Sequence, residues 1–256
     1  MAEDKTKRIR ELIGTLRAAG RAYYQESREI MSNFEYDKLY DELVSLEKET
    51  GIVFANSPTQ NVGYEVVSAL PKERHEKPML SLNKTKSVEE LADWLGGQTG
   101  LLSWKMDGLT IVLTYQNGTL VKAVTRGNGE IGEVITANAK AFVNVPLNIS
   151  YQGELILRGE AIIRYSDFEK INEQIEDVDA KYKNPRNLCS GSVRQLNSEI
   201  TAQRQVHFYA FSLVKADGID FKNSRKEQFE WLKNQGFEVV EYRKVMAATL
   251  DQAMDY

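Results

Sequence analysis

The sequence predicts an α+β fold in which a small N-terminal helical domain precedes a domain with a mainly antiparallel sheet. The first fifty residues carry apolar side chains at helical spacing, and a polar stretch follows them. Beyond that stretch, segments typical of strands and helices alternate without the regular βαβ order of a parallel sheet. We therefore expect two domains, residues 1–68 and residues 69–256.

Composition limits the class of protein. The 256 residues are 42% hydrophobic, enough for a packed core, and the net charge of -4 argues against broad, nonspecific DNA binding. The single cysteine, Cys189, allows no intrachain disulfide and suits a reducing, cytoplasmic compartment. We find no signal-peptide core and no apolar run that could span a membrane. With two histidines besides the cysteine, we expect no structural zinc site and assign no metal ligand.

Two helices are expected in the first domain. The second begins at the capping-box pattern Ser32-Asn33-Phe34-Glu35 and stops at Gly51. The polar residues 55–68 then form the expected linker. The first helix is predicted by apolar residues at helical spacing, namely Ile9, Leu12, Ile13, Leu16, Ala19 and Tyr23.

The second domain is expected to mix helices and strands. Ser87 caps a short helix that ends at Gly96, and Ser224 caps a last helix that Gly236 closes. Strands are predicted at residues 155–163 and 206–214, and a hairpin turns at Asn117-Gly118. A further helix is expected to be capped by Ser166-Asp167-Phe168-Glu169, with Phe168, Ile171, Ile175 and Val178 on one face.

The hairpin gathers chemically useful side chains. Counting back from the Asn117-Gly118 turn, Leu109 should face Arg126. Because alternate residues of a strand share a face, Lys105 and Asp107 are expected on the same side of the ribbon as these two, unless a bulge at Gly108 shifts the register by one. An amine, a carboxylate and a guanidinium would then meet beside the glycine-rich turn formed by residues 125–129.

This arrangement has two interpretations. An ordinary lysine amine has a pKa of about 10.4, so about one in a thousand is neutral at pH 7. A nucleophilic lysine must be neutral, and nearby cations and partial desolvation favour that form. Arg126 and a metal ion would supply part of that environment. The alternative is an exposed ion pair between Lys105 and Asp107, and on these residues alone it is the better interpretation.

Further motifs follow one another in a fixed order along the chain. They are Tyr23-Tyr24, Glu35-Tyr36-Asp37, residues 57–63, His75 with residues 78–83, Lys105-Met106-Asp107-Gly108, residues 125–129, Leu157-Arg158-Gly159-Glu160 and Asn184-Pro185-Arg186-Asn187. Each motif alone is weak, whereas the ordered set is highly specific. With its motifs in this order, the chain resembles the N-terminal part of the bacterial NAD-dependent DNA ligases over nearly its whole length. The resemblance implies a helical domain followed by a nucleotidyltransferase domain of the DNA ligase and mRNA-capping type.

The resemblance also implies a reaction. Lys105 would attack the adenylyl phosphate of NAD, become covalently adenylylated and release nicotinamide mononucleotide (NMN). In the complete family enzyme the AMP passes to a 5′-phosphate at a nick in duplex DNA, and the neighbouring 3′-hydroxyl then seals the strand. Charge on the phosphate oxygens would be stabilised by Mg²⁺ and arginines.

Roles for the adenylation pocket are carried over by motif. Asp107 would assist the nucleophile and Glu160 would hold ribose hydroxyls, with an ordinary ion pair to Arg158 as the alternative. Arg126 would contact ribose or phosphate, or else be a solvated cation of the hairpin. The resemblance implies that Ser81, Leu82 and Ser103 border the adenine. The alternative for Ser81 and Leu82 is ordinary loop packing.

Two more groups of residues receive roles through the resemblance. Arg186 and Arg194 would face the nick phosphates, with surface charge as the alternative. The resemblance implies that a set of aromatic and polar residues binds the NMN half. By helical periodicity alone, the tyrosines of this set are helix-packing residues. That set comprises Tyr23, Tyr24, Asn33, Tyr36 and Asp37. We assign no catalytic role to His75 and interpret Cys189 as a packing residue.

The chain departs from the family pattern at three pocket positions and in length. Ser103 replaces a glutamate, and Asn33 and Asn128 each replace an aspartate. We expect an adenylation domain truncated at its C-terminal end and lacking further ligase domains, either as a fragment or as a shortened paralogue. Two alternatives follow, namely an ATP-dependent nucleotidyltransferase of the same superfamily and a degenerate paralogue that binds nucleotide or a partner without chemistry. DNA binding by this chain alone would be weak or absent.

Overall fold

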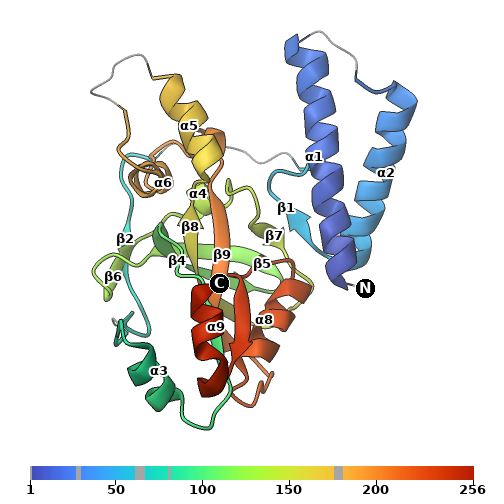
Figure 1. Cartoon of the computed structure of the whole chain (residues 1–256). Coiled ribbons are helices and arrows are strands. Elements are labelled where there is room, and N and C mark those ends of the chain that lie inside the picture. Colours follow the sequence, from blue (N-terminus) through green and yellow to red (C-terminus); the bar gives the residue numbers. More distant parts are fainter. Residues whose placement is uncertain (1, 27–29, 61–66, 80–81, 176–180) are drawn as a thin grey trace.

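The computed structural model describes residues 2–26, 30–60, 67–79, 82–175 and 181–256. The expected α+β architecture is confirmed, because a helical hairpin precedes a domain in which all strand pairings between the described strands are antiparallel. Figure 1 shows the hairpin standing beside the sheet, with the remaining helices around the sheet. Among the described helices, none combines the length and apolar character that crossing a bilayer requires.

The helical hairpin consists of α1 (Ala2–Glu26) and α2 (Asn33–Thr50). The predicted capping box is present, since the Ser32 hydroxyl accepts from the Glu35 amide and the Glu35 carboxylate accepts from the Ser32 amide. Gly51 ends α2 with φ 68°, a left-handed conformation that glycine adopts without strain. The apolar stripe packs into a core formed by Ile9, Leu12, Ile13, Leu16, Leu43, Ile52 and Phe54.

The chain joins the large sheet directly after this hairpin. Strand β1 (Val53–Phe54) pairs with β7 (Pro146–Asn148), so the helical part contributes the edge strand of the following sheet. The sequence did not predict this strand, because two residues carry no alternating pattern. Of the expected linker, residues 55–60 and 67–68 are described.

The main sheet has six strands in the order β1-β7-β5-β4-β8-β9. The predicted hairpin is formed by β4 (Leu109–Gln116) and β5 (Thr119–Thr125), and the two other predicted strands are β8 (Leu155–Ile162) and β9 (His207–Ala216). One face of the sheet is packed into the core through side chains such as Ile111, Leu113 and Leu157, none of which is exposed. The alternate residues of β4 and β8 therefore lie on the opposite, more open face.

Two smaller ribbons and several helices complete the second domain. The ribbons pair β2 (Lys72–Arg74) with β6 (Ile131–Glu133) and β3 (Gly100–Ser103) with β10 (Tyr242–Val245). The helices are α3 (Val88–Leu95), α4 (Thr136–Ala139), α5 (Tyr165–Glu173), α6 (Pro185–Val193), α7 (Ser198–Gln203), α8 (Arg225–Asn234), η2 (Ala247–Thr249) and α9 (Leu250–Asp255). The predicted caps Ser87 and Ser224 both accept the expected backbone hydrogen bonds.

One helix differs from its prediction. The helix expected to start with a Ser166 cap is α5, which begins at Tyr165 after Arg164 and has no side-chain cap. Ser166 therefore lies within the first turn. The helix ends at Glu173, so Ile175 is outside it, and Val178 lies outside the described residues. Serine is favoured at the N-cap of a helix, but a serine near the start of a helix does not fix which residue is the first.

Candidate active site

The candidate nucleophile lies on a loop between β3 and β4. Lys105 is exposed, and the loop is pressed against β8 at Gly108. A Cβ atom at Gly108 would meet the Ala161 carbonyl oxygen at 1.9 Å, a distance that real Cβ atoms do not approach. Glycine is therefore required here because the backbone of the loop touches the neighbouring strand, and this contact holds Lys105 close to the end of β8.

Glu160, on β8, is the half-buried acid of the site. Its carboxylate accepts from the Gly108 amide at 3.1 Å and from the Thr110 hydroxyl at 2.8 Å. Burial raises the pKa of Glu160 above its ordinary value, and these hydrogen bonds and the charges of Lys105 and Arg186 oppose that rise. Lys105 thus lies within electrostatic reach of Glu160. The alternative ion pair with Arg158 is wrong, because the Arg158 guanidinium donates to the Lys77 carbonyl oxygen instead.

The register of the β4–β5 hairpin differs from the prediction by one residue. A bulge between Thr114 and Tyr115 shifts the pairing, so the Arg126 amide donates to the Thr110 carbonyl at 2.9 Å and Leu109 does not face Arg126. Thr110 also pairs with Glu160 across the β4–β8 ladder. Arg126, Thr110 and Glu160 therefore share the open face of the sheet.

The expectation that strand alternation would place Lys105 and Asp107 on that same face is also wrong. Strand β4 begins only at Leu109, and the residues before it form an irregular loop. What brings Lys105 to Glu160 is the contact of Gly108 with β8 rather than strand periodicity. The hairpin still contributes to the site, but through Thr110 and Arg126.

The glycine-rich turn after β5 is held in place from outside the hairpin. The His75 ring nitrogen Nε2 bonds the Arg126 carbonyl at 3.1 Å, and the Arg126 guanidinium donates to the Met79 carbonyl at 3.3 Å. Gly129 has φ 97°, and its carbonyl accepts from the Met79 amide at 2.8 Å. Arg126 is half-buried, so its interpretation as a fully solvated cation is not supported.

Asn128 supports this turn from within. Its side-chain oxygen accepts from the backbone amides of Glu130 at 3.0 Å and Ile131 at 2.8 Å. An aspartate oxygen would make the same two bonds, so replacing a family aspartate by asparagine preserves the geometry of the turn.

Asp107 is paired with an arginine from a distant part of the chain. The Arg186 guanidinium lies 2.7 Å from the Asp107 carboxylate, and the two side chains are 59% and 71% exposed. The alternative ion pair between Lys105 and Asp107 is therefore not formed among the described residues. A pair this exposed contributes at most about 1 kcal/mol to stability, so it can open at little cost. Arg186 sits in the first turn of α6, which Asn184 caps.

Other residues expected at the pocket lie further out. Arg194 follows the C-terminal end of α6 and pairs with Glu133 at 2.8 Å, so the length of the helix separates it from Arg186. Ser103 is exposed on β3 and pairs across the ribbon with Tyr242. Leu82 is 91% exposed, and Ser81 lies outside the described residues.

The residues expected to bind NMN belong to the helical hairpin. Tyr36 stacks on Tyr40 with ring centroids 6.4 Å apart and packs against the helical core, which favours a packing role in this conformation. Asp37 is exposed on α2. The side chains of Tyr23, Tyr24 and Asn33 are not described.

The open face of the sheet is hollowed next to this cluster. A cleft of about 350 Å³ runs between the sheet and the segment around β2, and its lining includes Val112, Val124, Ile156 and Arg158. Arg158 is two residues from Glu160 on the same face, although neither Glu160 nor Lys105 lines the cleft itself. The arrangement offers an amine, a hydrogen-bonded carboxylate and a guanidinium beside a polar cleft.

Two site residues escaped the sequence-based prediction. The sequence around Thr110 carries no local signal that its hydroxyl bonds Glu160. His75, to which we assign no catalytic role, supports the glycine-rich turn through its bond to the Arg126 carbonyl. The packing role expected for Cys189 is confirmed, since it is fully buried and burial raises the pKa of its thiol to about 12.

Comparison with known proteins gives a consistent result over both parts of the chain. Residues 67–256 match the family model described as NAD-dependent DNA ligase adenylation domain, and residues 2–63 match the model described as DNA ligase-like, N-terminal NAD+-binding domain. Curated relatives named DNA ligase include proteins from Lachnoclostridium phytofermentans (66% identity) and Ruminiclostridium cellulolyticum (64% identity). A third, from Thermodesulfovibrio yellowstonii, is 38% identical.

These alignments cover most of this chain but a smaller part of each relative. The first two cover 99% of the chain and the third covers 95%. The same alignments span only 39%, 38% and 38% of the three relatives.

Proposed function

This chain belongs to the family of NAD-dependent DNA ligases, and from that membership we propose that Lys105 is the nucleophile that takes AMP from NAD. The observation that carries the proposal is the position of Lys105, exposed on a loop that Gly108 holds against β8, within electrostatic reach of Glu160. An isolated surface lysine would need no such contact.

The proposed step is the transfer of an adenylyl group to an amine. The Lys105 ammonium first passes a proton to solvent, and its neutral Nζ then attacks the adenylyl phosphorus of NAD and releases a second proton to solvent as the phosphoramidate forms. A P–N bond forms, the P–O bond to NMN breaks, and NMN leaves with the bonding electrons. The product is a lysyl-AMP phosphoramidate, and both the amine and the leaving phosphate depend on neighbouring cations for stabilisation.

Glu160 and Arg126 would orient the nucleotide on the open face of the sheet. An ionised carboxylate has about four lone-pair sites, and two of those of Glu160 accept from Gly108 and Thr110. The remaining sites suit the ribose hydroxyls. Arg126, fixed between Met79 and the glycine-rich turn, would present donors to ribose or phosphate oxygens.

Asp107 would assist the amine and help to hold Mg²⁺. Among the described residues, no group of three acidic, histidine or cysteine side chains forms a preformed metal site. Mg²⁺ typically keeps several waters and takes one or two carboxylates together with substrate phosphates, so the exposed Asp107 fits such an ion bound with NAD. When bound, Mg²⁺ would neutralise charge on the phosphates. Asp107 would have to leave Arg186 to serve either role.

The remaining assignments complete the proposal. Ser81, Leu82 and Ser103 would border the adenine, and Arg186 and Arg194 would meet the phosphates of a DNA nick. The NMN-binding set, Tyr23, Tyr24, Asn33, Tyr36 and Asp37, would require the helical hairpin to face the nucleotide. We propose the domain division at residues 68 and 69, a cytoplasmic location, and nick sealing only together with the domains that the longer relatives contain.

Intact-mass spectrometry after incubation with NAD and Mg²⁺ tests the proposal. The wild-type chain should gain one AMP, Lys105→Ala should gain none, and Lys86→Ala, which removes another exposed lysine, should behave as wild type. ATP in place of NAD should give no adduct, and an adduct with ATP alone would favour the ATP-dependent alternative. If neither wild type nor variant gains AMP, the non-catalytic paralogue is the better description.

A further inference from the structure

A second cleft, separate from the Lys105 site, opens between the helical hairpin and the sheet domain. Its volume is about 410 Å³, within the range of small-molecule sites, and its lining includes residues of α1, residues after β1, residues after α4 and the start of β9. Lys105, Glu160, Arg126 and Arg186 do not line it. The roles proposed above therefore leave this cleft without an assigned ligand.

The charged side chains that line the cleft are predominantly cationic. Arg10, Arg17, Lys140 and Arg164 face it, whereas its only acidic lining residue among those described is Glu238. The chain as a whole carries a net charge of -4, so this concentration of positive charge does not follow from composition. Four cations around one carboxylate leave an excess positive charge that a bound anion would neutralise.

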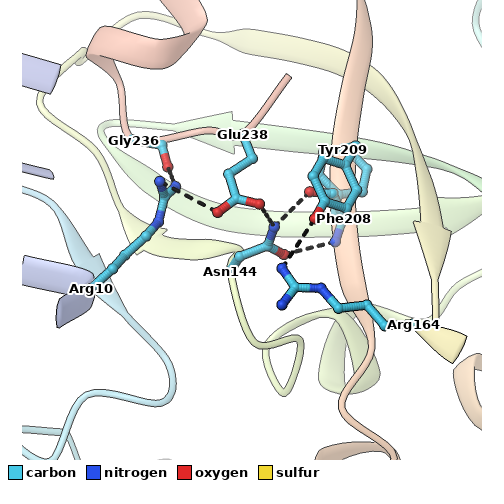
Figure 2. A network of polar contacts seen from close by, with 7 residues as sticks. All are labelled: Arg10, Asn144, Arg164, Phe208, Tyr209, Gly236 and Glu238. Carbon is cyan, nitrogen blue, oxygen red and sulfur yellow. Dashed lines mark hydrogen bonds and ion pairs between the residues drawn. The ribbon is translucent and has the colours of Figure 1, made fainter. Parts of the chain in front are cut away.

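Part of the cleft is fixed by a polar network, which Figure 2 shows from close by. The Arg10 guanidinium donates to the Gly236 carbonyl at 2.7 Å and lies 3.5 Å from the Glu238 carboxylate. Glu238 accepts from the Asn144 side chain at 2.9 Å, and the same amide group of Asn144 bonds the backbone of Phe208. Glu238 is thus already satisfied and neutralises at most one of the four cations.

The remaining polar groups of the cleft differ in how far they are paired. Arg164 donates to the Tyr209 hydroxyl at 3.2 Å (Figure 2). The buried Nε atom of Arg10 has no hydrogen-bond partner in the described part of the chain, and the carbonyl oxygen of the Asn56 side chain is likewise buried and unpaired. The Lys140 ammonium forms no hydrogen bond or ion pair with the described residues, and Arg17 donates to the Asn56 backbone carbonyl at 3.1 Å. A buried donor or acceptor left unpaired costs stability unless a ligand or water satisfies it.

We propose that this cleft binds a phosphate monoester, carried by a ligand of about the size of a nucleoside monophosphate. Planar guanidinium groups match the oxygens of a phosphate, and a lysine adds a point charge. The cleft is larger than a phosphate ion alone needs, and the unpaired Asn56 oxygen would accept from a hydroxyl or amide of the attached group. The ligand would bridge α1 and the sheet domain.

His207 supplies a site-specific reporter for this proposal. It lines the cleft, and the chain has only one other histidine, His75, which lies at the glycine-rich turn. Burial and then the charge of Arg164 lower the pKa of His207, while the Gln205 carbonyl, Glu238 and Asp167 oppose this. A phosphate dianion in the cleft would raise the pKa of His207 and move its ring-proton signal in NMR spectra.

The test titrates the whole chain with inorganic phosphate and with uridine monophosphate, which avoids an adenine base, at an ionic strength matched with chloride. The His207 signal should move saturably while the His75 signal moves less. The double variant Arg17→Gln, Lys140→Gln should weaken binding at least tenfold. The control Lys226→Gln, Lys244→Gln removes the same charge from exposed sites and should change binding less than twofold.

Three results would overturn the proposal. The first is a His207 signal that phosphate does not move beyond the chloride effect, and the second is an equal loss of binding in the control variant. The third is a duplex DNA without terminal phosphates that displaces uridine monophosphate, because it would assign the cleft to backbone phosphodiesters. Lysine adenylation by the Arg17, Lys140 variant should remain as in wild type, which separates this site from the Lys105 site.

Discussion

At the scale of single residues, burial of the ionised Glu160 lowers the stability of the fold. Its pKa is raised by burial, so the folded state favours the protonated form more than the unfolded chain does. The stability contributed by that form is present below the ordinary glutamate pKa and is lost as pH rises through the folded value. At pH 7 the ionised Glu160 therefore destabilises the fold, as expected of a residue that serves the binding role we propose.

Glu160→Gln should separate these two effects. Glutamine keeps an oxygen that can accept from Gly108 or Thr110 but carries no charge, so the free energy of unfolding should stay the same or rise by up to about 1 kcal/mol. Lysine adenylation should fall by ~10- to 100-fold, because a charge-assisted hydrogen bond worth about 1.5–3 kcal/mol is lost. Urea denaturation and adduct formation measure the two quantities. A loss of stability that parallels the loss of activity would make Glu160 a structural residue.

Asn128 tests whether the departures from the family pattern matter. Because its oxygen accepts two backbone amides, Asn128→Asp should leave adduct formation within about threefold of wild type. Asn128→Ala removes both bonds and should lower the free energy of unfolding by about 1–3 kcal/mol. Thermal denaturation with parallel adduct assays checks both variants. An inactive Asn128→Asp would show that charge, rather than geometry, decides at this position.

At the scale of structural elements, the contact between the Lys105 loop and β8 is the decisive one. Gly108→Ala would drive a Cβ into the Ala161 carbonyl, and the loop and the strand would have to separate. We expect a loss of about 2–4 kcal/mol in the free energy of unfolding and a loss of adduct formation. Gly97→Ala is the matched control, because nothing lies within 4 Å of its added methyl. Equal effects in the two variants would refute the role of the contact.

The elements also show which parts of the fold a sequence reveals. Helices with local signals were predicted well, because Ser32, Ser87, Ser224 and Gly51 act through bonds to residues a few positions away. The bulge in the β4–β5 hairpin was not predicted, since one extra residue in a strand leaves no clear pattern. Two- and three-residue strands such as β1 and β7 depend on partners distant in sequence, so their pairing emerges only in the folded chain.

The candidate site divides in the same way. The motif order identified Lys105, Asp107, Arg126 and Glu160 as neighbours, and the structure brings Lys105, Asp107 and Glu160 near Arg186. The motif order could not identify Thr110 as the partner of Glu160, nor Arg186 as the partner of Asp107. Those contacts join segments tens of residues apart, and their geometry depends on register and helix position rather than on residue type.

At the scale of the whole molecule, Arg10 of the helical hairpin contacts the sheet domain, and His207 lines the cleft between the two parts. Because burial lowers the pKa of His207, the unfolded chain binds a proton more tightly there than the folded chain. Stability should therefore fall as pH drops through the ordinary histidine pKa of about 6.5 towards the lower folded value. His207→Gln should flatten this dependence in denaturation curves between pH 7 and 5. A variant with an unchanged slope would assign the dependence to other groups.

The chain covers about two fifths of its curated relatives, so its own chemistry is best tested on the first step alone. The most direct measurement is peptide mapping by mass spectrometry of the chain after reaction with NAD and Mg²⁺. We predict AMP on the peptide that contains Lys105, lost on mild acid treatment because the P–N bond is acid-labile. AMP on a different lysine, or an adduct that survives in Lys105→Ala, would contradict the account.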